Sequence, residues 1–440
     1  MACPMRNAGP VTPLHRALML GTLVVGATLA WRGALFAHAM LLSSDPKAGS
    51  VLARSPERVR LVFSEAIDAA VSGIRVVPLG AAPIDLSVAA DPRDAKALVA
   101  PLASLVPGRY RIVWRSVSVD GHAVNGSFGF TVRGDTTAAP SVVPPILPPI
   151  FQMDTLPPSA SSHVPVIAGL LRGMALGFLM ALAGVLFFSR RAAVDSPRAS
   201  RVCVWLAATA VVLLAAHLVA WVSSSAAERT VDLAWGRSMI GTAPGKLDLA
   251  RLVAAALALC ALALARQRSL ALLFAAGGLV ISGAMGHPAA IHSLWTIPAK
   301  AIHLCAGATW LGGLLWLILA NSVSAEAFAV QARRVSTVAL VSVVLVVFSG
   351  IIQTRFFLAT PSDLIRTTYG IFVLLKIAGV LILIAFGAYH RSRLLPSLAD
   401  ADAGIRLRES VRFEIGVFTL VVLLGGLLAY LPAPGGYPVR

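Results

Sequence analysis

Apolar residues occupy alternate positions in three stretches of the first third of the chain. These positions are Val59, Leu61 and Phe63; Tyr110, Ile112 and Trp114; and Phe128, Phe130 and Val132. A period of two is typical of strands that bury one face, and the prolines between the stretches disfavour long helices. The pattern predicts a small all-β Greek-key sandwich over residues 38–133, which is large enough to hold a core without disulfides.

Longer apolar runs begin at residue 164. They cover residues 164–188, 202–222, 247–265, 270–286, 298–319, 337–358, 370–389 and 413–431. A bilayer requires about 20 consecutive apolar residues to be crossed by one helix, and these runs come near or reach that length. The sequence therefore predicts that the sandwich is followed by an all-α polytopic membrane bundle of about eight helices, over residues 164–431.

The remaining segments have compositions of their own. Residues 1–37 carry Arg6 and Arg16 before an apolar stretch and small residues, which is the layout of a signal peptide. Cleavage after Ala37 and cleavage after Ala39 both fit, and an uncleaved anchor stays open. Residues 134–163 are rich in Pro, Thr and Ser, which predicts a semi-rigid linker. Residues 432–440 are a short tail, expected outside.

Composition supports the membrane assignment. Of 440 residues, 57% are hydrophobic and 13% are charged, and the formal net charge is +17. Most of the arginines lie between apolar runs, which makes them a topology signal and not a nucleic-acid surface. Their distribution predicts a multi-pass membrane protein with the N-terminal domain exported, in the periplasm or extracellular space. The four cysteines are too few for a disulfide framework.

Asp120-Gly121-His122 lies between two predicted strands. Asp-Gly is a common turn dipeptide, so a plain hairpin is one interpretation. The other involves His38, which becomes the first residue if cleavage follows Ala37. A free amine and its own imidazole chelate one metal ion, and His122 and Asp120 would complete a tetragonal set of three nitrogens and one oxygen. Such a set suits Cu(II).

Four further histidines fall near the outer ends of the predicted spans. They are His217, His287, His292 and His303. An imidazole within a membrane is costly unless it faces a cavity or a partner, so these residues form a candidate membrane copper path. The alternative is that each forms a hydrogen bond within the bundle. Charged residues also fall within or beside apolar runs, namely Arg172, Arg251, Lys376 and Glu414. For Arg172 and Glu414, snorkelling or mutual pairing is one interpretation and a transport role is the other.

The first part of the chain resembles a known family. The run H-A-M-L-L-S-S-D-P-K-A-G-S from His38, the run P-E-R-V-R-L-V-F-S-E from Pro56, and residues 114–132 resemble the CopC family of periplasmic copper-binding sandwiches. The resemblance implies that His38, Asp120 and His122 hold Cu(II), and it favours cleavage after Ala37. Residues 41–133 contain no methionine, so we expect no methionine-rich Cu(I) site in this domain.

The helical part resembles the CopD family of copper-resistance membrane proteins. The resemblance is carried by A-M-G-H-P, which contains His287, and by H-L-C-A-G-A-T-W-L-G-G, which begins at His303. It continues along the chain with Ser349-Gly350, Tyr369-Gly370, Lys376 and Glu414, in the order found in the family. A CopC–CopD fusion implies a copper homeostasis and resistance protein that passes copper to or across the inner membrane, in the inward direction. The expected partners are copper ion, the bilayer and a periplasmic copper chaperone or reductase, with no nucleic acid.

Two questions stay open at this level. A Cu(I) site in the membrane domain would require soft ligands, for which Met174 and Met285 are candidates. The rival function is a membrane redox protein that binds haem b through intramembrane histidines, which a Soret band would reveal. We expect a transport protein and not an enzyme, with no ATP-binding motif in the sequence.

Overall fold

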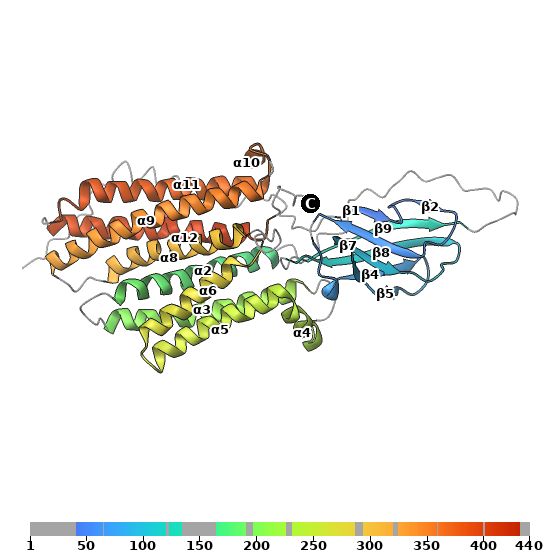
Figure 1. The fold of residues 1–440 in the computed structure, drawn as a ribbon, viewed down its shortest axis with the longest axis horizontal. Helices are drawn as coiled ribbons and strands as arrows, with labels where there is room; N and C mark the ends of the chain where they lie inside the picture. The colour runs from blue at the N-terminus through green and yellow to red at the C-terminus, as the bar shows by residue number, and fades with distance from the viewer. Residues whose placement is uncertain are drawn as a thin grey trace, which may run out of the picture.

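The structure, a computed structural model, describes residues 41–64, 66–119, 123–133, 164–190, 197–225, 231–286, 294–319, 324–358, 360–398 and 401–431. A β-sandwich lies at one end of a long helical bundle (Figure 1). The predicted fold class is therefore confirmed. The predicted signal peptide, linker and tail lie outside the described residues. Below, residues 41–133 are called the head, and the end of the bundle that carries it is called the head-side end.

The head consists of two sheets. Its strands are β1 (Leu41–Asp45), β2 (Val51–Leu52), β3 (Arg58–Phe63), β4 (Gly73–Pro78), β5 (Ile84–Leu86), β6 (Ala89–Asp91), β7 (Asp94–Pro101), β8 (Gly108–Val117) and β9 (Ala123–Val132). One sheet has the order β1-β3-β7-β6 and the other β2-β9-β8-β4-β5. A short 3-10 helix, η1 (Ala69–Val71), precedes β4. All strand pairs are antiparallel except β2 with β9, which is parallel.

The alternating residues form the core of the head, as predicted. Val59, Leu61 and Phe63 are fully buried, and the Phe63 ring packs edge-on against Trp114, with ring centroids 5.2 Å apart. Gly126 of β9 lies opposite Trp114 in the sheet. A Cβ at Gly126 would lie 2.5 Å from the indole ring, so the close approach of the ring requires a glycine there.

The second part of the chain is helical throughout the described ranges. Its elements are α2 (Val164–Ser189), α3 (Pro197–Ser224), α4 (Leu233–Gly241), α5 (Ala243–Ala263), α6 (Arg268–Gly283), α8 (Thr296–Leu319), α9 (Ala325–Phe357), α10 (Asp363–Arg366), α11 (Thr368–Tyr389), the π-helical turn η3 (His390–Leu394) and α12 (Ala401–Leu428). Within the described residues, six helices are long and apolar enough to cross a membrane. These are α2, α3, α8, α9, α11 and α12.

The eight predicted spans differ from these six at α5 and α6. Helix α6 has 16 residues and is shorter than a span. Helix α5 has 21 residues but carries Lys246, Asp248 and Arg251 in its first half. Six of the eight predicted segments therefore meet the criteria of length and composition for a span, and the other two, α5 and α6, pack against each other and against α3 and α2.

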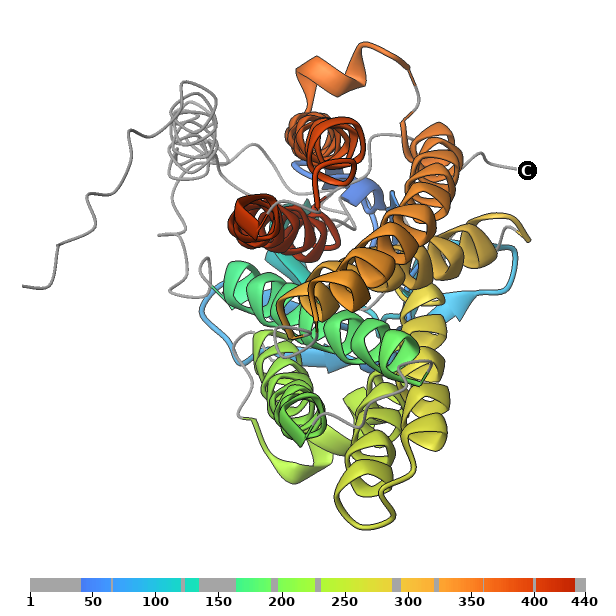
Figure 2. The ribbon, with the colours of Figure 1, turned by 90° about the vertical axis from the view of Figure 1, so that its left-hand side faces the viewer.

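Helix α2 lies in the middle of the bundle, where it packs against α3, α6, α8 and α12 (Figure 2). Two glycine contacts allow its backbone to approach its neighbours. A Cβ at Gly184 would lie 2.0 Å from the Ala308 carbonyl oxygen and 2.6 Å from the Cα of Gly312 on α8. A Cβ at Gly426 of α12 would lie 2.5 Å from Gly173 of α2. Small residues at crossings are the usual means of close helix packing in membranes.

Candidate functional site

The three predicted copper ligands His38, Asp120 and His122 lie outside the described residues. The strands that flank them are described. Residue 41 begins β1, while β8 ends at Val117 and β9 begins at Ala123, directly opposite it. The expected ligand segments are therefore the residues just before β1 and the connection between β8 and β9.

The pairing of the strands shows that these two segments belong to the same end of the head. Leu41 pairs with Phe63, the last residue of β3. Directly after β3, the Ala66 carbonyl accepts a hydrogen bond from the Val119 N–H at 2.9 Å, and Ile67 forms a bridge with Ser118. The sequence thus folds so that the start of β1 and the β8–β9 connection are brought to one end of the sandwich.

That end of the head is docked on the bundle. Val71 and Val117 of the head are 3% and 1% exposed, and they form one buried cluster with Trp221, Trp235 and Met239 of the bundle. Helix α4, which begins after an Asp232 cap, presents Trp235 to the head. The contact is apolar at its centre, so burial of these side chains favours association.

Polar groups fix the orientation of this contact. The Arg115 guanidinium lies 4.1 Å from the centroid of the Trp235 ring, a cation–π arrangement. Arg115 also donates to the Val71 carbonyl, and the Trp235 indole N–H donates to the Val222 carbonyl at 3.2 Å. One arginine of the head is thus held both by its own domain and by the bundle.

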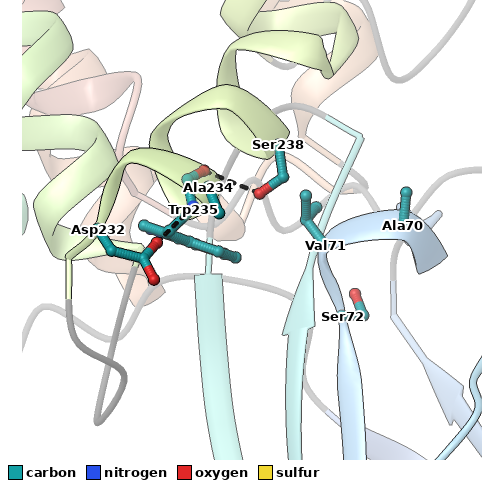
Figure 3. A pocket seen from close by; sticks show the side chains of 7 residues that line it. All are labelled: Ala70, Val71, Ser72, Asp232, Ala234, Trp235 and Ser238. Atoms are coloured by element: carbon teal, nitrogen blue, oxygen red, sulfur yellow. Dashed lines mark hydrogen bonds between the residues drawn. The ribbon is translucent and has the colours of Figure 1, made fainter.

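A cavity of about 540 Å³ opens beside this contact (Figure 3). Its walls are Ala70, Val71 and Ser72 on the head side and Asp232, Ala234, Trp235 and Ser238 on α4. The Asp232 carboxylate accepts from the Trp235 N–H at 2.7 Å, and the Ser238 hydroxyl donates to the Trp235 carbonyl. Ser72 forms hydrogen bonds within the head, and Asp232 and Ser238 form hydrogen bonds within α4. Asp232 is the one carboxylate among the lining residues, so the cavity does not provide a set of metal ligands.

His217 of α3 is fully buried at the head-side end of the bundle. Its Nε2 lies 2.8 Å from the Tyr430 hydroxyl. Its Nδ1 lies 3.5 Å from the Asp248 carboxylate and 3.3 Å from an Arg251 nitrogen. Arg251 forms a buried ion pair with Asp248. Both ring nitrogens of His217 are engaged by the protein, so this conformation does not offer the ring as a haem or copper ligand.

His303 of α8 has a different environment. Its Nδ1 lies 3.0 Å from the Ser349 hydroxyl and 3.1 Å from the Val346 carbonyl, both on α9. Gly350 leaves room beside the ring, because a Cβ there would lie 3.7 Å from the His303 Cε1. The structure therefore gives His217 and His303 separate hydrogen-bond partners.

His287 and His292, the other members of the predicted path, lie outside the described residues. Within the described ranges, no group of three or more His, Cys, Asp and Glu side chains is placed to hold a metal ion. The membrane path thus stays a prediction. Sequence reasoning missed Asp248 and Tyr430, although an acidic residue three positions before Arg251 in an apolar helix is a signal for a buried pair.

At the opposite end of the bundle, His390 and Glu414 form a second polar group. The His390 Nδ1 lies 3.5 Å from a Glu414 carboxylate oxygen, and its Nε2 lies 2.8 Å from the Ser410 hydroxyl. The Trp310 indole also hydrogen-bonds the Glu414 carboxylate. Glu414 does not pair with Arg172, which instead hydrogen-bonds Tyr430 at the head-side end.

The architecture defines a class: a β-sandwich domain docked on one end of a multi-pass helical bundle. Residues 41–133 match the family described as CopC domain, and residues 329–428 match the family Copper resistance protein D. Copper resistance protein C of Escherichia coli is 35% identical over 130 residues, which cover 27% of this chain and 98% of that protein. The chain therefore belongs to the CopC family through its head, and it carries a CopD domain in the same polypeptide.

Two further similarities extend this picture. Copper transport protein CutJ of Bacillus subtilis (strain 168) is 23% identical over 433 residues, 91% of this chain and 75% of that protein. The crystal structure of CopC from Methylosinus trichosporium OB3b has 26% sequence identity, covers 23% of this chain and all of that chain, and gives a TM-score of 0.22.

Proposed function

We propose that the protein is a copper homeostasis and resistance protein that captures Cu(II) on its head and passes copper to or across the inner membrane, in the inward direction. The family assignment supports copper as the cargo, because the relatives are described as copper resistance and copper transport proteins. The head then acts as the receptor, and the bundle acts as the route.

The observation that carries this proposal is the position of the predicted ligand segments. The strand pairing brings the start of β1 and the β8–β9 connection to one end of the head. The same end is docked against α3 and α4, since Val117 is buried with Trp221 and Trp235. Copper held there would lie next to the bundle and not at the far end of the sandwich.

The donor set fits Cu(II). The mature amine and imidazole of His38, with the His122 imidazole and the Asp120 carboxylate, provide three nitrogens and one oxygen, as tetragonal Cu(II) prefers. No methionine is present in residues 41–133. The head therefore has no thioether for a separate Cu(I) site, and transfer of copper into the bundle as Cu(I) would require a reductase or another electron donor.

The test uses the full-length mature protein. Mass spectrometry of the N-terminus establishes whether residue 38 is the first, and electron paramagnetic resonance during Cu(II) titration reports the ligand atoms. We expect an N-terminal His38 and a nitrogen-rich tetragonal spectrum, which His122→Ala changes and weakens. The matched control His163→Ala, in the predicted linker, should leave the spectrum unchanged.

A mature chain that begins at Met40, or the same spectrum in wild type and His122→Ala, would contradict the proposed site. Direction is tested separately in cells, where copper accumulation should rise with expression of the wild-type protein and return to background with His122→Ala. Decreased accumulation on expression would indicate export.

A further inference from the structure

Basic side chains gather at the head-side end of the bundle in excess over acidic ones. Arg172 of α2 and Arg251 of α5 are 8% and 1% exposed. Lys300 of α8 lies close enough to both arginines, and to Lys376 of α11, for their charges to interact. Within the described residues, Asp248 is the carboxylate that pairs with this group, and it binds Arg251. The term head-side cations below means Arg172, Arg251, Lys300 and Lys376.

Two of these cations converge on one point. Gly286 follows α6 with φ of +75°, a backbone conformation that favours glycine. A Cβ at this position would lie 3.6 Å from an Arg172 terminal nitrogen and 3.8 Å from the Lys300 ammonium. The terminal groups of an arginine and a lysine therefore both lie next to the position that a side chain at residue 286 would occupy.

The polar partners of the head-side cations do not balance their charge. Lys300 donates to the Met285 carbonyl, and Arg172 hydrogen-bonds the Tyr430 hydroxyl. Both partners are neutral oxygens. Among the described residues, the buried Arg251 Nε has no hydrogen-bond partner, and no carboxylate lies within ion-pair distance of Lys300 or Lys376. Uncompensated charges at such a place are costly.

An anion would supply the missing charge. Arginine and lysine together are the side chains that bind phosphate groups through charge-assisted hydrogen bonds. Lys300 lies four residues into α8 and Arg172 eight residues into α2, which places them about 6 and 12 Å along their helices from the head-side ends. These depths are within reach of the polar headgroup layer of a bilayer.

We infer that the head-side cations form a binding site for a phosphate group, seated beside Gly286 between Arg172 and Lys300. The group belongs either to an anionic phospholipid headgroup or to free phosphate. The site has a consequence for a metal route, because four basic side chains with one paired carboxylate leave an excess of positive charge that opposes the approach of a bare copper cation. A bound phosphate lowers that electrostatic barrier. The inference rests on the helical bundle alone and goes beyond the copper function proposed for the head.

The experiment compares two phosphate sources with the purified full-length protein. Thermal unfolding in detergent is followed in sodium phosphate and in sodium chloride of equal ionic strength. In parallel, the protein is reconstituted into nanodiscs of phosphatidylcholine with or without phosphatidylglycerol, and the lipid that it retains is identified by native mass spectrometry. Both measurements are made without copper, so that their results do not depend on copper binding by the head.

The variants are Lys300→Met and Arg172→Gln, which remove one charge each, and Lys300→Arg, which keeps the charge. Arg237→Gln is the matched control, since Arg237 is exposed on α4 at the same end of the bundle. We expect each neutral variant to weaken phosphate or phosphatidylglycerol binding by about tenfold, the loss of one charge-assisted contact. Lys300→Arg and Arg237→Gln should bind as wild type does.

The outcomes are distinguishable. Stabilisation by inorganic phosphate that the neutral variants lose identifies a free anion, and selective retention of phosphatidylglycerol that they lose identifies a lipid headgroup. If neither source binds to the wild-type protein, the inference is wrong. It is also wrong if Arg237→Gln reduces binding as much as Lys300→Met does, because the effect would then reflect general surface charge. A variant that does not fold is replaced in the comparison by the other neutral variant.

Discussion

The head and the bundle treat charged side chains in opposite ways. In the head, the ion pairs Arg60–Asp91 and Arg75–Asp85 lie on the surface of the sheets, and the Asp85 side chain is 71% exposed. In the bundle, the Asp248–Arg251 pair is almost fully buried, with side chains 4% and 1% exposed. Both domains have dense apolar cores, so core packing alone does not explain why the ion pairs are exposed in the head and buried in the bundle.

The comparison indicates where each domain performs its function. A surface ion pair costs little and contributes little, so the charges of the head are compatible with any solvated sandwich. A buried charge in a membrane protein is expensive and is typical of a functional place. We therefore expect the head to depend on a few ligands at one end, and the bundle to depend on the polar groups in its interior.

The largest loss of stability is expected when the buried ion pair is broken. Asp248→Ala leaves the Arg251 guanidinium without its carboxylate, which should destabilise the protein by about 3–5 kcal/mol. Thermal unfolding of the detergent-purified protein measures this. The control Asp85→Ala, at an exposed pair of the head, should cost less than about 1 kcal/mol. Equal losses in the two variants would contradict the contrast between the domains.

A smaller loss of stability is expected where a glycine allows two helices to pack closely. Gly184→Ala places a Cβ against the Ala308 carbonyl of α8, and we expect the forced separation of α2 and α8 to cost about 1–3 kcal/mol. Gly277→Ala is the matched control, because a Cβ at Gly277 meets nothing within 4 Å. Alanine is the better helix former, so this control should be neutral or stabilising in the same unfolding assay.

The contact between the head and the bundle should weaken when one aromatic ring, that of Trp235, is removed. Trp235→Ala removes the surface on which Arg115 stacks, a contact of about 1–2 kcal/mol. The head should remain folded but detach more often, which hydrogen exchange at residues 69–73 and 115–119 would show as faster exchange. Trp205→Ala, a highly exposed tryptophan on α3, should leave exchange there unchanged. Equal protection in wild type and Trp235→Ala would mean that the stacking contact does not hold the head.

The smallest expected effect is on the pH dependence of the stability of the head. The Arg93 backbone N–H and the Arg60 guanidinium lower the pKa of Asp91 from its ordinary value. The ionised form is therefore favoured by folding, and its contribution is complete above the ordinary carboxyl pKa of about 4. It is lost as the pH falls through the lower folded pKa. The difference in unfolding temperature between wild type and Asp91→Asn should be small at pH 7 and disappear in strong acid. A difference that persists or grows in acid would contradict this assignment.

Sequence patterns predicted the head well because alternation reports burial directly. Val59, Leu61 and Phe63 alternate in the sequence and are fully buried in the structure. The predicted spans all coincide with helices, yet α6 is shorter than a full span and α5 carries three charged residues in its first half. Apolar composition indicates helix burial, but it does not distinguish lipid from neighbouring helices as the environment.

The contacts between distant segments could not be predicted. Nothing in the local sequence joins His217 to Tyr430, which are 213 positions apart and lie in hydrogen-bond distance. The stacking of Arg115 on Trp235 likewise depends on how two domains meet. The copper ligands His38, Asp120 and His122 stay predictions, and what the structure adds is that their flanking strands share one end of the head.

The most direct test of the account is the distance from bound Cu(II) to the bundle, measured by pulsed electron paramagnetic resonance. Nitroxide labels are placed by Ser238→Cys on α4 or by Ser397→Cys after η3, in a full-length background in which Cys3, Cys203, Cys260 and Cys305 are replaced by serine. We predict that copper lies closer to the label at position 238, by about the 30 Å length of α11. Equal distances, a shorter distance to position 397, or no bound Cu(II) in the mature protein would contradict the central claim.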